Sequence, residues 1–166
     1  ANKIHITLVS DFFDFAVRHN QRIYIEIKDF RTIADIKLLT DLVESYNYES
    51  MTNIQSFNID DLVEVRRLNK RVNVGWLTTN INSIQEDIDF DKLQKLKYAD
   101  ALIVDTIMVA FPEVQKKCYD ADIGVCTWGI QYTLDVQNAM GVNVPRVITD
   151  LANNPTIKRG LQNVTY

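Results

Sequence analysis

The chain has 166 residues, with 18 Lys and Arg against 22 Asp and Glu, which gives a formal net charge of −4. This length suits one ordinary domain, and we expect residues 1–166 to form a single domain. Because there is no basic surplus, no nucleic-acid partner is expected. Apolar residues make up 46% and charged residues 24%, which excludes a disordered chain. The best apolar run, 101–111, is short and contains Asp105, so no transmembrane segment is predicted.

Short runs rich in β-branched and aromatic residues predict about six strands. These runs are residues 22–28, 52–57, 71–78, 101–105, 122–128 and 146–150. Several are nearly continuous apolar runs, as is typical of parallel strands buried on both faces. The gaps between them leave room for crossover helices, whereas hairpins would need only a few residues. The sequence therefore predicts an α/β fold with a parallel sheet.

Helical patterns occupy the predicted gaps. Residues 32–46 place apolar side chains at helical spacing and begin with a capping box of Thr32 and Asp35. Residues 58–69 begin with Asn58 as a cap, carry acidic residues in the first turn and end with basic ones. Residues 7–19 form a further helix, in which we expect Leu8, Phe12 and Phe15 to point inward. Later helices are expected to begin near Pro112 and Pro155.

Two architectures fit this order of elements: an open doubly wound sheet, or part of a (β/α)₈ barrel. An open nucleotide-binding sheet normally has a glycine-rich turn after an early strand, and no such motif occurs among the 5 glycines. A whole barrel takes about 250 residues. About six strands therefore predict an incomplete barrel.

The functional groups of a barrel gather at the carboxyl ends of its strands. The first strand ends with Glu26 and Lys28 on one side, where they can hold a cation and an anion, or simply form a salt bridge; their types alone favour the salt bridge. The second ends with Ser56 and Phe57, and the fifth with Trp128. Aromatic residues at such ends more often pack than bind ligands.

The remaining reactive residue types give no catalytic arrangement. His5 and His19 flank the first predicted helix, outside any metal-ligand spacing, and suit surface or helix-end positions. Cys118 and Cys126 are too few for a disulfide framework and are expected to be structural thiols. The residues alone therefore supply no acid–base pair.

Taken in order, the strand ends resemble the C-terminal part of the glycerophosphodiester phosphodiesterase family. The resemblance runs through ITLVSDFFDFAVRHNQRIYIEIK, QSFNIDDLVEVRRL, GVCTW and GVNVPRVITD, from about residue 6 to residue 151. It implies a (β/α)₈ TIM-type barrel that hydrolyses glycerol phosphodiesters to glycerol 3-phosphate and an alcohol, as in glycerol and lipid metabolism. It also implies a divalent cation, calcium or magnesium, and two catalytic histidines.

The resemblance implies roles for several residues. Glu26 corresponds to a metal ligand and Lys28 to a lysine near the substrate phosphate. Trp128 corresponds to an apolar wall of the glycerol pocket, with Ser56 and Phe57 at its rim. Suitable substrates are small glycerophosphodiesters derived from lysolipids, or polyglycerol-phosphate polymers.

Other motifs of the family are absent from the sequence. Its H-R-G histidine, E-x-D carboxylates and H-D histidine are expected to precede residue 1, and W-T-x-N is replaced by Trp128-Gly129-Ile130-Gln131. One hypothesis is the downstream part of a phosphodiesterase, inactive without an N-terminal barrel segment supplied by the same protein or another chain. The alternative is a non-catalytic phosphate-binding or structural module of a larger assembly.

Overall fold

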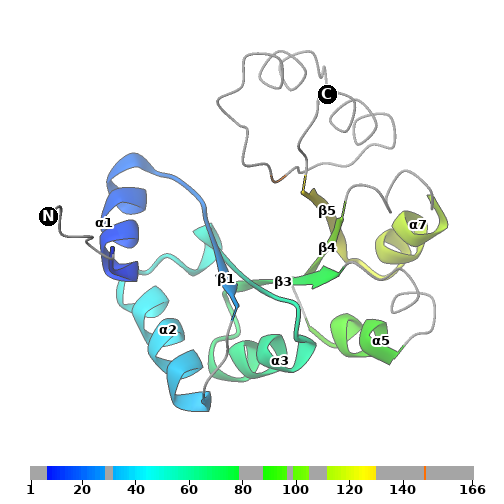
Figure 1. Cartoon of the computed structure of the whole chain (residues 1–166), viewed down its shortest axis with the longest axis horizontal. Coiled ribbons are helices and arrows are strands. Elements are labelled where there is room, and N and C mark those ends of the chain that lie inside the picture. The colour runs from blue at the N-terminus through cyan, green and yellow to red at the C-terminus, as the bar shows by residue number, and fades with distance from the viewer. Residues whose placement is uncertain are drawn as a thin grey trace, which may run out of the picture.

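The computed structural model describes residues 7–28, 32–78, 88–96, 99–104, 112–129 and 148. Strands and helices alternate along this part of the chain (Figure 1). The helices are α1 (Val9–His19), α2 (Ile33–Ser45), α3 (Ile59–Leu68), α5 (Ile88–Gln94) and α7 (Pro112–Asp120), with a short 3-10 turn, η1 (Glu49–Met51). The strands are β1 (Ile23–Ile27), β2 (Thr52–Ser56), β3 (Asn73–Thr78), β4 (Ala99–Val104) and β5 (Gly124–Trp128).

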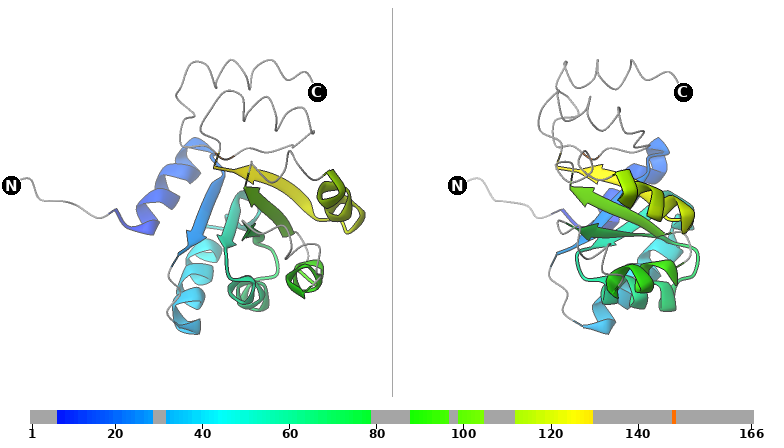
Figure 2. Two further views of the ribbon diagram at one scale, coloured as in Figure 1. Left: turned by 45° about the vertical axis from the view of Figure 1, so that its right-hand side comes forward. Right: turned by 90° about the vertical axis from the view of Figure 1, so that its right-hand side faces the viewer.

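The described strands form one sheet in which every neighbouring pair is parallel, in the order β1-β2-β3-β4-β5. The helices lie in an arc around the outer side of this sheet, as Figures 1 and 2 show from three directions. The predicted α/β class with a parallel sheet is therefore confirmed. Spatial order that follows chain order is the arrangement of a barrel rather than of a doubly wound sheet, whose strand order reverses at a switch point.

The main hydrophobic core lies between the sheet and the helices. Alternate strand residues, among them Ile54, Val74, Trp76 and Val125, are buried there against apolar residues of the helices. Because side chains alternate across a strand, the residues between them point to the other, inner face of the sheet. A separate small cluster on that face joins Leu77 and Cys126, with the half-buried Trp128 and Ile148 beside them.

The predicted helix starts are confirmed by the structure. Thr32 donates both its amide and its hydroxyl to the Asp35 carboxylate, at 2.8 and 2.9 Å. The Asn58 side chain accepts the Asp60 amide at 3.0 Å, as an N-cap does. α7 begins at Pro112, where the missing amide hydrogen costs nothing. Local capping chemistry therefore sets where these helices begin.

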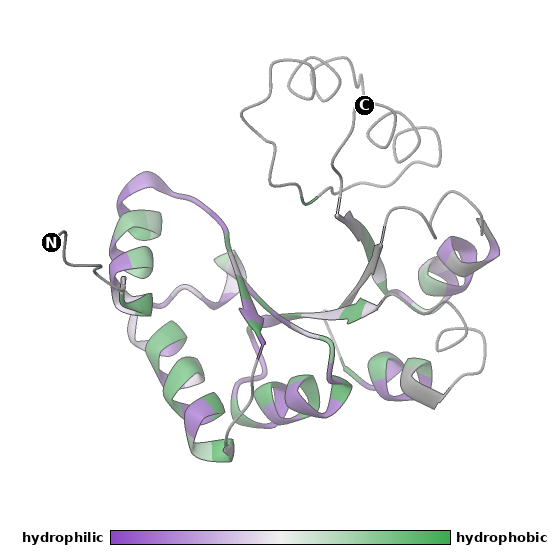
Figure 3. Cartoon of the chain, in the orientation of Figure 1, coloured by the Kyte–Doolittle hydropathy of each residue, from purple (hydrophilic) through white to green (hydrophobic). Residues whose placement is uncertain are grey.

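The predicted inner face of the first helix is wrong. Leu8, Phe12 and Phe15 are exposed, whereas Phe13 and Ala16 are buried. The Phe13 ring stacks on Tyr46 with 5.1 Å between centroids, and Tyr48 donates its hydroxyl to the Ala16 carbonyl. Hydrophobic residues occur all along α1 (Figure 3) and cover a wide arc of it, in which Phe12 and Phe15 lie at one edge.

The sixth predicted strand, 146–150, lies outside the described residues except for Ile148. The Ile148 amide donates to the Thr127 carbonyl at 2.8 Å, which places this residue alongside β5. At the other edge, β1 pairs only with β2 within the described residues. Pro155 and His5 also lie outside the described residues.

None of the described helices combines the length and the hydrophobicity that crossing a membrane requires.

Candidate functional site

The candidate site lies at the edge of the sheet where all the strands end. Because β1 to β5 are parallel, their carboxyl ends share one edge. Ile27 pairs with Ser56, Ser56 with Trp76, and Val104 with Trp128. The residues predicted from separate strands are therefore brought to the same edge.

Glu26 and Lys28 lie on the inner face of β1 and form an ion pair. The Lys28 Nζ is 3.4 Å from the Glu26 Oε2, and the two side chains are 77% and 26% exposed. The interpretation favoured from residue types, a salt bridge, is the arrangement that the structure shows. A pair this exposed adds little stability, so the Lys28 amine can leave it for an anion at small cost.

Phe57 and Trp128 contact each other across the inner face. Their ring centroids are 5.6 Å apart and the rings meet edge to face. β2 and β5 are separated by β3 and β4, and at roughly 4.8 Å between strands a flat sheet would hold them about 14 Å apart. The contact therefore follows from side chains that converge on the concave side of a curved sheet, as in a barrel wall.

Ser56 does not share this face. Its hydroxyl donates to the Asp61 Oδ2 at 2.8 Å and accepts the Asn58 amide at 3.0 Å, beneath the start of α3. The residue is only 1% exposed. The structure therefore places Phe57 but not Ser56 on the inner face, because successive residues point to opposite faces of a strand.

Sequence reasoning missed Gln55, which lies on the inner face directly beside Glu26. The two residues are register partners, and Gly75 is the partner of Gln55 on β3. Gln55 is 8% exposed, and its Oε1 has no hydrogen-bond partner among the described residues. The signal available in the sequence was alternation, since Gln55 precedes Phe57 by two positions.

The described residues do not fit a divalent cation by themselves. No group of three or more His, Cys, Asp or Glu side chains is placed to hold a metal in this part of the chain. On β1 and β2, Glu26 is the carboxylate of the inner face, whereas calcium takes six to eight oxygen ligands. Any cation held by Glu26 requires carboxylates from elsewhere, and no chemical step of a cation can be derived from these residues.

The two cysteines behave as expected of structural thiols. Both are free and buried. Burial raises the pKa of the Cys118 thiol to about 12, so it is protonated at neutral pH and not a nucleophile.

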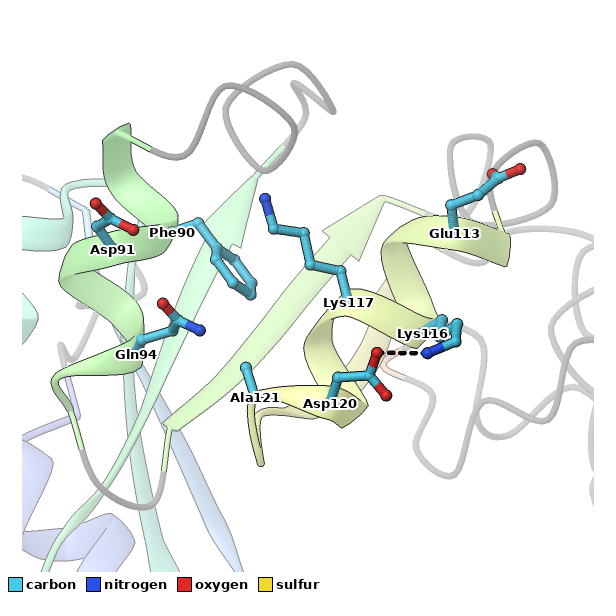
Figure 4. Close-up of a pocket in the computed structure, with 8 residues that line it drawn as sticks. All are labelled: Phe90, Asp91, Gln94, Glu113, Lys116, Lys117, Asp120 and Ala121. Atoms are coloured by element: carbon cyan, nitrogen blue, oxygen red, sulfur yellow. Dashed lines mark hydrogen bonds and ion pairs between the residues drawn. The ribbon is translucent and has the colours of Figure 1, made fainter.

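A groove of about 520 Å³ lies between α5 and α7, on the helical side of the sheet (Figure 4). Lys116 pairs with Asp120, and the Lys117 Nζ lies 4.6 Å from the centre of the Phe90 ring. These charged residues interact with their neighbours on the helices, and the groove is not part of the carboxyl edge.

The fold is shared with solved barrels. A glycerophosphodiester phosphodiesterase from Parabacteroides distasonis superposes with a TM-score of 0.75 at 19% identity, over 93% of this chain and 63% of that one. One from Agrobacterium tumefaciens gives 0.68 at 13% identity, over 93% and 61%. An EAL domain protein from Listeria monocytogenes gives 0.58 at 14% identity, over 82% and 62%.

The chain spans less than two thirds of these solved structures, although almost all of it is matched. No protein-family model matches the sequence, and a comparison with curated proteins also finds no match. The phosphodiesterase structures are TIM barrels, and the described sheet is parallel and not closed. The resemblance read from the strand ends is thus confirmed in fold: the chain is built like part of a glycerophosphodiester phosphodiesterase barrel.

Proposed function

We propose that this chain forms part of a glycerophosphodiester phosphodiesterase barrel. With N-terminal strands in place, it would hydrolyse glycerol phosphodiesters to glycerol 3-phosphate and an alcohol. The observation that carries the proposal is the convergence of an ion-paired Lys28 and the Phe57–Trp128 pair on the inner face at one sheet edge. This edge is where barrel enzymes place their active sites.

In this proposal the residues of the chain bind and orient the substrate. The exposed Lys28 amine meets the phosphate as a point charge. Phe57 and Trp128 form an apolar wall against the carbon atoms of glycerol, since their rings already lie together on the inner face. With carboxylates from the missing strands, Glu26 would be one of several ligands of a calcium or magnesium ion. The acid and base would come from histidines outside the described residues.

The second candidate is a non-catalytic phosphate-binding or structural module. It is favoured by the mutual neutralisation of Glu26 and Lys28 and by the lack of a metal-holding cluster among the described residues. Such a module would keep the barrel wall and the anion contact without turnover.

The experiment compares this chain with a version extended by the residues encoded upstream of Ala1. Hydrolysis of glycerophosphocholine is followed with added calcium or magnesium. We expect no turnover by the 166-residue chain and turnover by an extended chain that carries H-R-G and E-x-D. Turnover by the 166-residue chain alone contradicts the proposal that it holds only part of the active site. An extended chain that binds phosphate without turnover supports the non-catalytic module.

A further inference from the structure

Gln55 is a buried polar side chain that no contact in the described structure explains. It is 8% exposed, and its Oε1 has no hydrogen-bond partner among the described residues. Buried amide oxygens are nearly always paired in proteins, because an unpaired one loses its hydration without replacement. An acceptor kept in this state is open to a partner that the described residues do not supply.

The surroundings of Gln55 leave room for such a partner. On one side its register partner is Gly75, which has no side chain to fill the space. A glycine within a strand is typical of a place where a ligand comes close. On the other side lies Glu26, a second oxygen acceptor. An unpaired amide oxygen beside a carboxylate suits either a cation or a hydroxyl group as its partner.

The chemistry of the acceptor favours hydroxyl groups at Gln55. The Gln55 amide carries no charge, and the neighbouring Glu26 is 3.4 Å from Lys28. No group of three or more His, Cys, Asp or Glu side chains is placed to hold a metal among the described residues, whereas a neutral amide oxygen accepts a hydrogen bond from an O–H donor. Phe57 lies one inner-face position beyond Gln55 and contacts Trp128, so the two rings can cover the carbon atoms of the same ligand.

We propose that the Gln55 amide oxygen accepts a hydrogen bond from a hydroxyl of a polyol phosphate whose phosphate lies at Lys28. This assignment rests on the proposed function and adds to it a residue that selects the glycerol part. Gln55 is level with Glu26, and Lys28 lies two residues further along, a distance of roughly 6.6 Å on a strand. A phosphate at Lys28 and a hydroxyl at Gln55 therefore suit a three-carbon polyol phosphate. The hydroxyl keeps its proton and no bond is broken.

The test uses the full chain and two phosphates that differ in their hydroxyl groups. Glycerol 3-phosphate and n-propyl phosphate, which lacks hydroxyls, are titrated by NMR into the wild type and Gln55→Met, whose side chain has similar length and no amide. We expect Gln55→Met to bind glycerol 3-phosphate about tenfold more weakly, the weight of one hydrogen bond. Its affinity for n-propyl phosphate should be unchanged.

Gln115 offers a matched control, because it is also 8% exposed but donates to the Tyr119 hydroxyl at 3.1 Å on α7. Gln115→Met should lower the melting temperature and leave glycerol 3-phosphate binding unchanged. Gln55→Met, which removes an unpaired group, should leave the melting temperature unchanged or raise it in the absence of ligand.

Equal glycerol 3-phosphate affinities for the wild type and Gln55→Met overturn this inference while the phosphate site stands. A fall in melting temperature as large as that of Gln115→Met, or failure of both Gln55→Met and Gln55→Leu to fold, assigns Gln55 a structural role and also overturns it. If the wild type binds neither phosphate, the proposed function fails as well.

Discussion

The two faces of the sheet differ in what their side chains contact. The outer face packs Ile54, Val74 and Trp76 into a continuous core with the helices. The inner face carries the ion-paired Glu26 and the unpaired amide oxygen of Gln55. Barrel interiors are usually filled by bulky branched side chains. The comparison teaches that stability comes mainly from the outer face, and the inner face is where we propose that a ligand binds.

The two tryptophans test this contrast most strongly, because the chain has one on each face. Trp76 is 3% exposed in the outer core, whereas Trp128 is half-buried over a small cluster. Trp76→Ala should lower the free energy of unfolding by about 3–5 kcal/mol. Trp128→Ala should cost clearly less and instead weaken binding of glycerol 3-phosphate.

Urea unfolding followed by circular dichroism measures both losses. Trp76→Phe provides a milder control that leaves Trp128 as the fluorescent reporter of ligand binding. Equal losses from the two alanine variants would contradict the division of roles between the faces.

The next largest effect on stability is expected at Ser56 and Phe57, which are adjacent in sequence and point to opposite faces of the sheet. Ser56→Ala removes a buried hydroxyl that contacts both Asp61 and the Asn58 amide, and should cost about 1–3 kcal/mol. Phe57, 48% exposed, should cost less when changed to alanine but should weaken glycerol 3-phosphate binding. Thermal unfolding and a ligand titration on the same samples separate the two. If Ser56→Ala weakens ligand binding and leaves stability unchanged, Ser56 contacts the ligand and the separation of the two faces is wrong.

Gly129 follows β5 directly, in the segment where Trp128-Gly129-Ile130-Gln131 replaces W-T-x-N. A substitution at Gly129 tests how strongly the backbone conformation there is required. Its φ of 80° lies in the left-handed region, where a Cβ is unfavourable. Gly129→Ala should therefore lower the free energy of unfolding by about 1 kcal/mol. Urea unfolding with Gly124→Ala alongside gives a comparison at the start of the same strand. No loss at position 129 would show that the loop tolerates another conformation.

The smallest change in stability is expected from the inner ion pair. Lys28→Met should change the free energy of unfolding by less than about 1 kcal/mol, like Lys37→Met in the exposed Lys37–Asp41 pair of α2. The two variants differ in function, since only Lys28→Met should weaken phosphate binding, and most clearly at low salt. Identical phosphate titrations for both variants would exclude Lys28 as the anion contact.

The fold was largely predictable because strands buried on one packed face leave a clear pattern. The run of Ile23, Ile25 and Ile27 marks β1, and the Thr32–Asp35 capping box marks the start of α2. The packed side of α1 was predicted wrongly, because apolar residues cover a wide arc of the helix and the prediction chose the edge with Phe12 and Phe15. In the structure Phe13 packs against Tyr46 and Tyr48.

The candidate site was predictable in part. Strand ends located Glu26, Lys28, Phe57 and Trp128, because parallel strands end at one edge. Alternation from Phe57 places Gln55 on the inner face, but only its burial without a partner, which the structure shows, distinguishes it from other polar strand residues. Ser56 was expected at the pocket rim, but its side chain points to the other face, where its hydroxyl accepts the amide of Asn58 at the start of α3.

The sequential strand order also bears on how the chain acquires its structure. Each described strand pairs with the strand that comes next in the sequence, as Ile25 does with Ile54 and Ile54 with Val74. Each pairing closes a segment that contains one helix, and no pairing has to wait for a strand further along the chain, so the entropy lost at each step is limited. The sheet can therefore grow one strand and helix at a time as the polypeptide is synthesised. Pulse-labelling hydrogen exchange would detect this as protection that spreads from one strand to its neighbour.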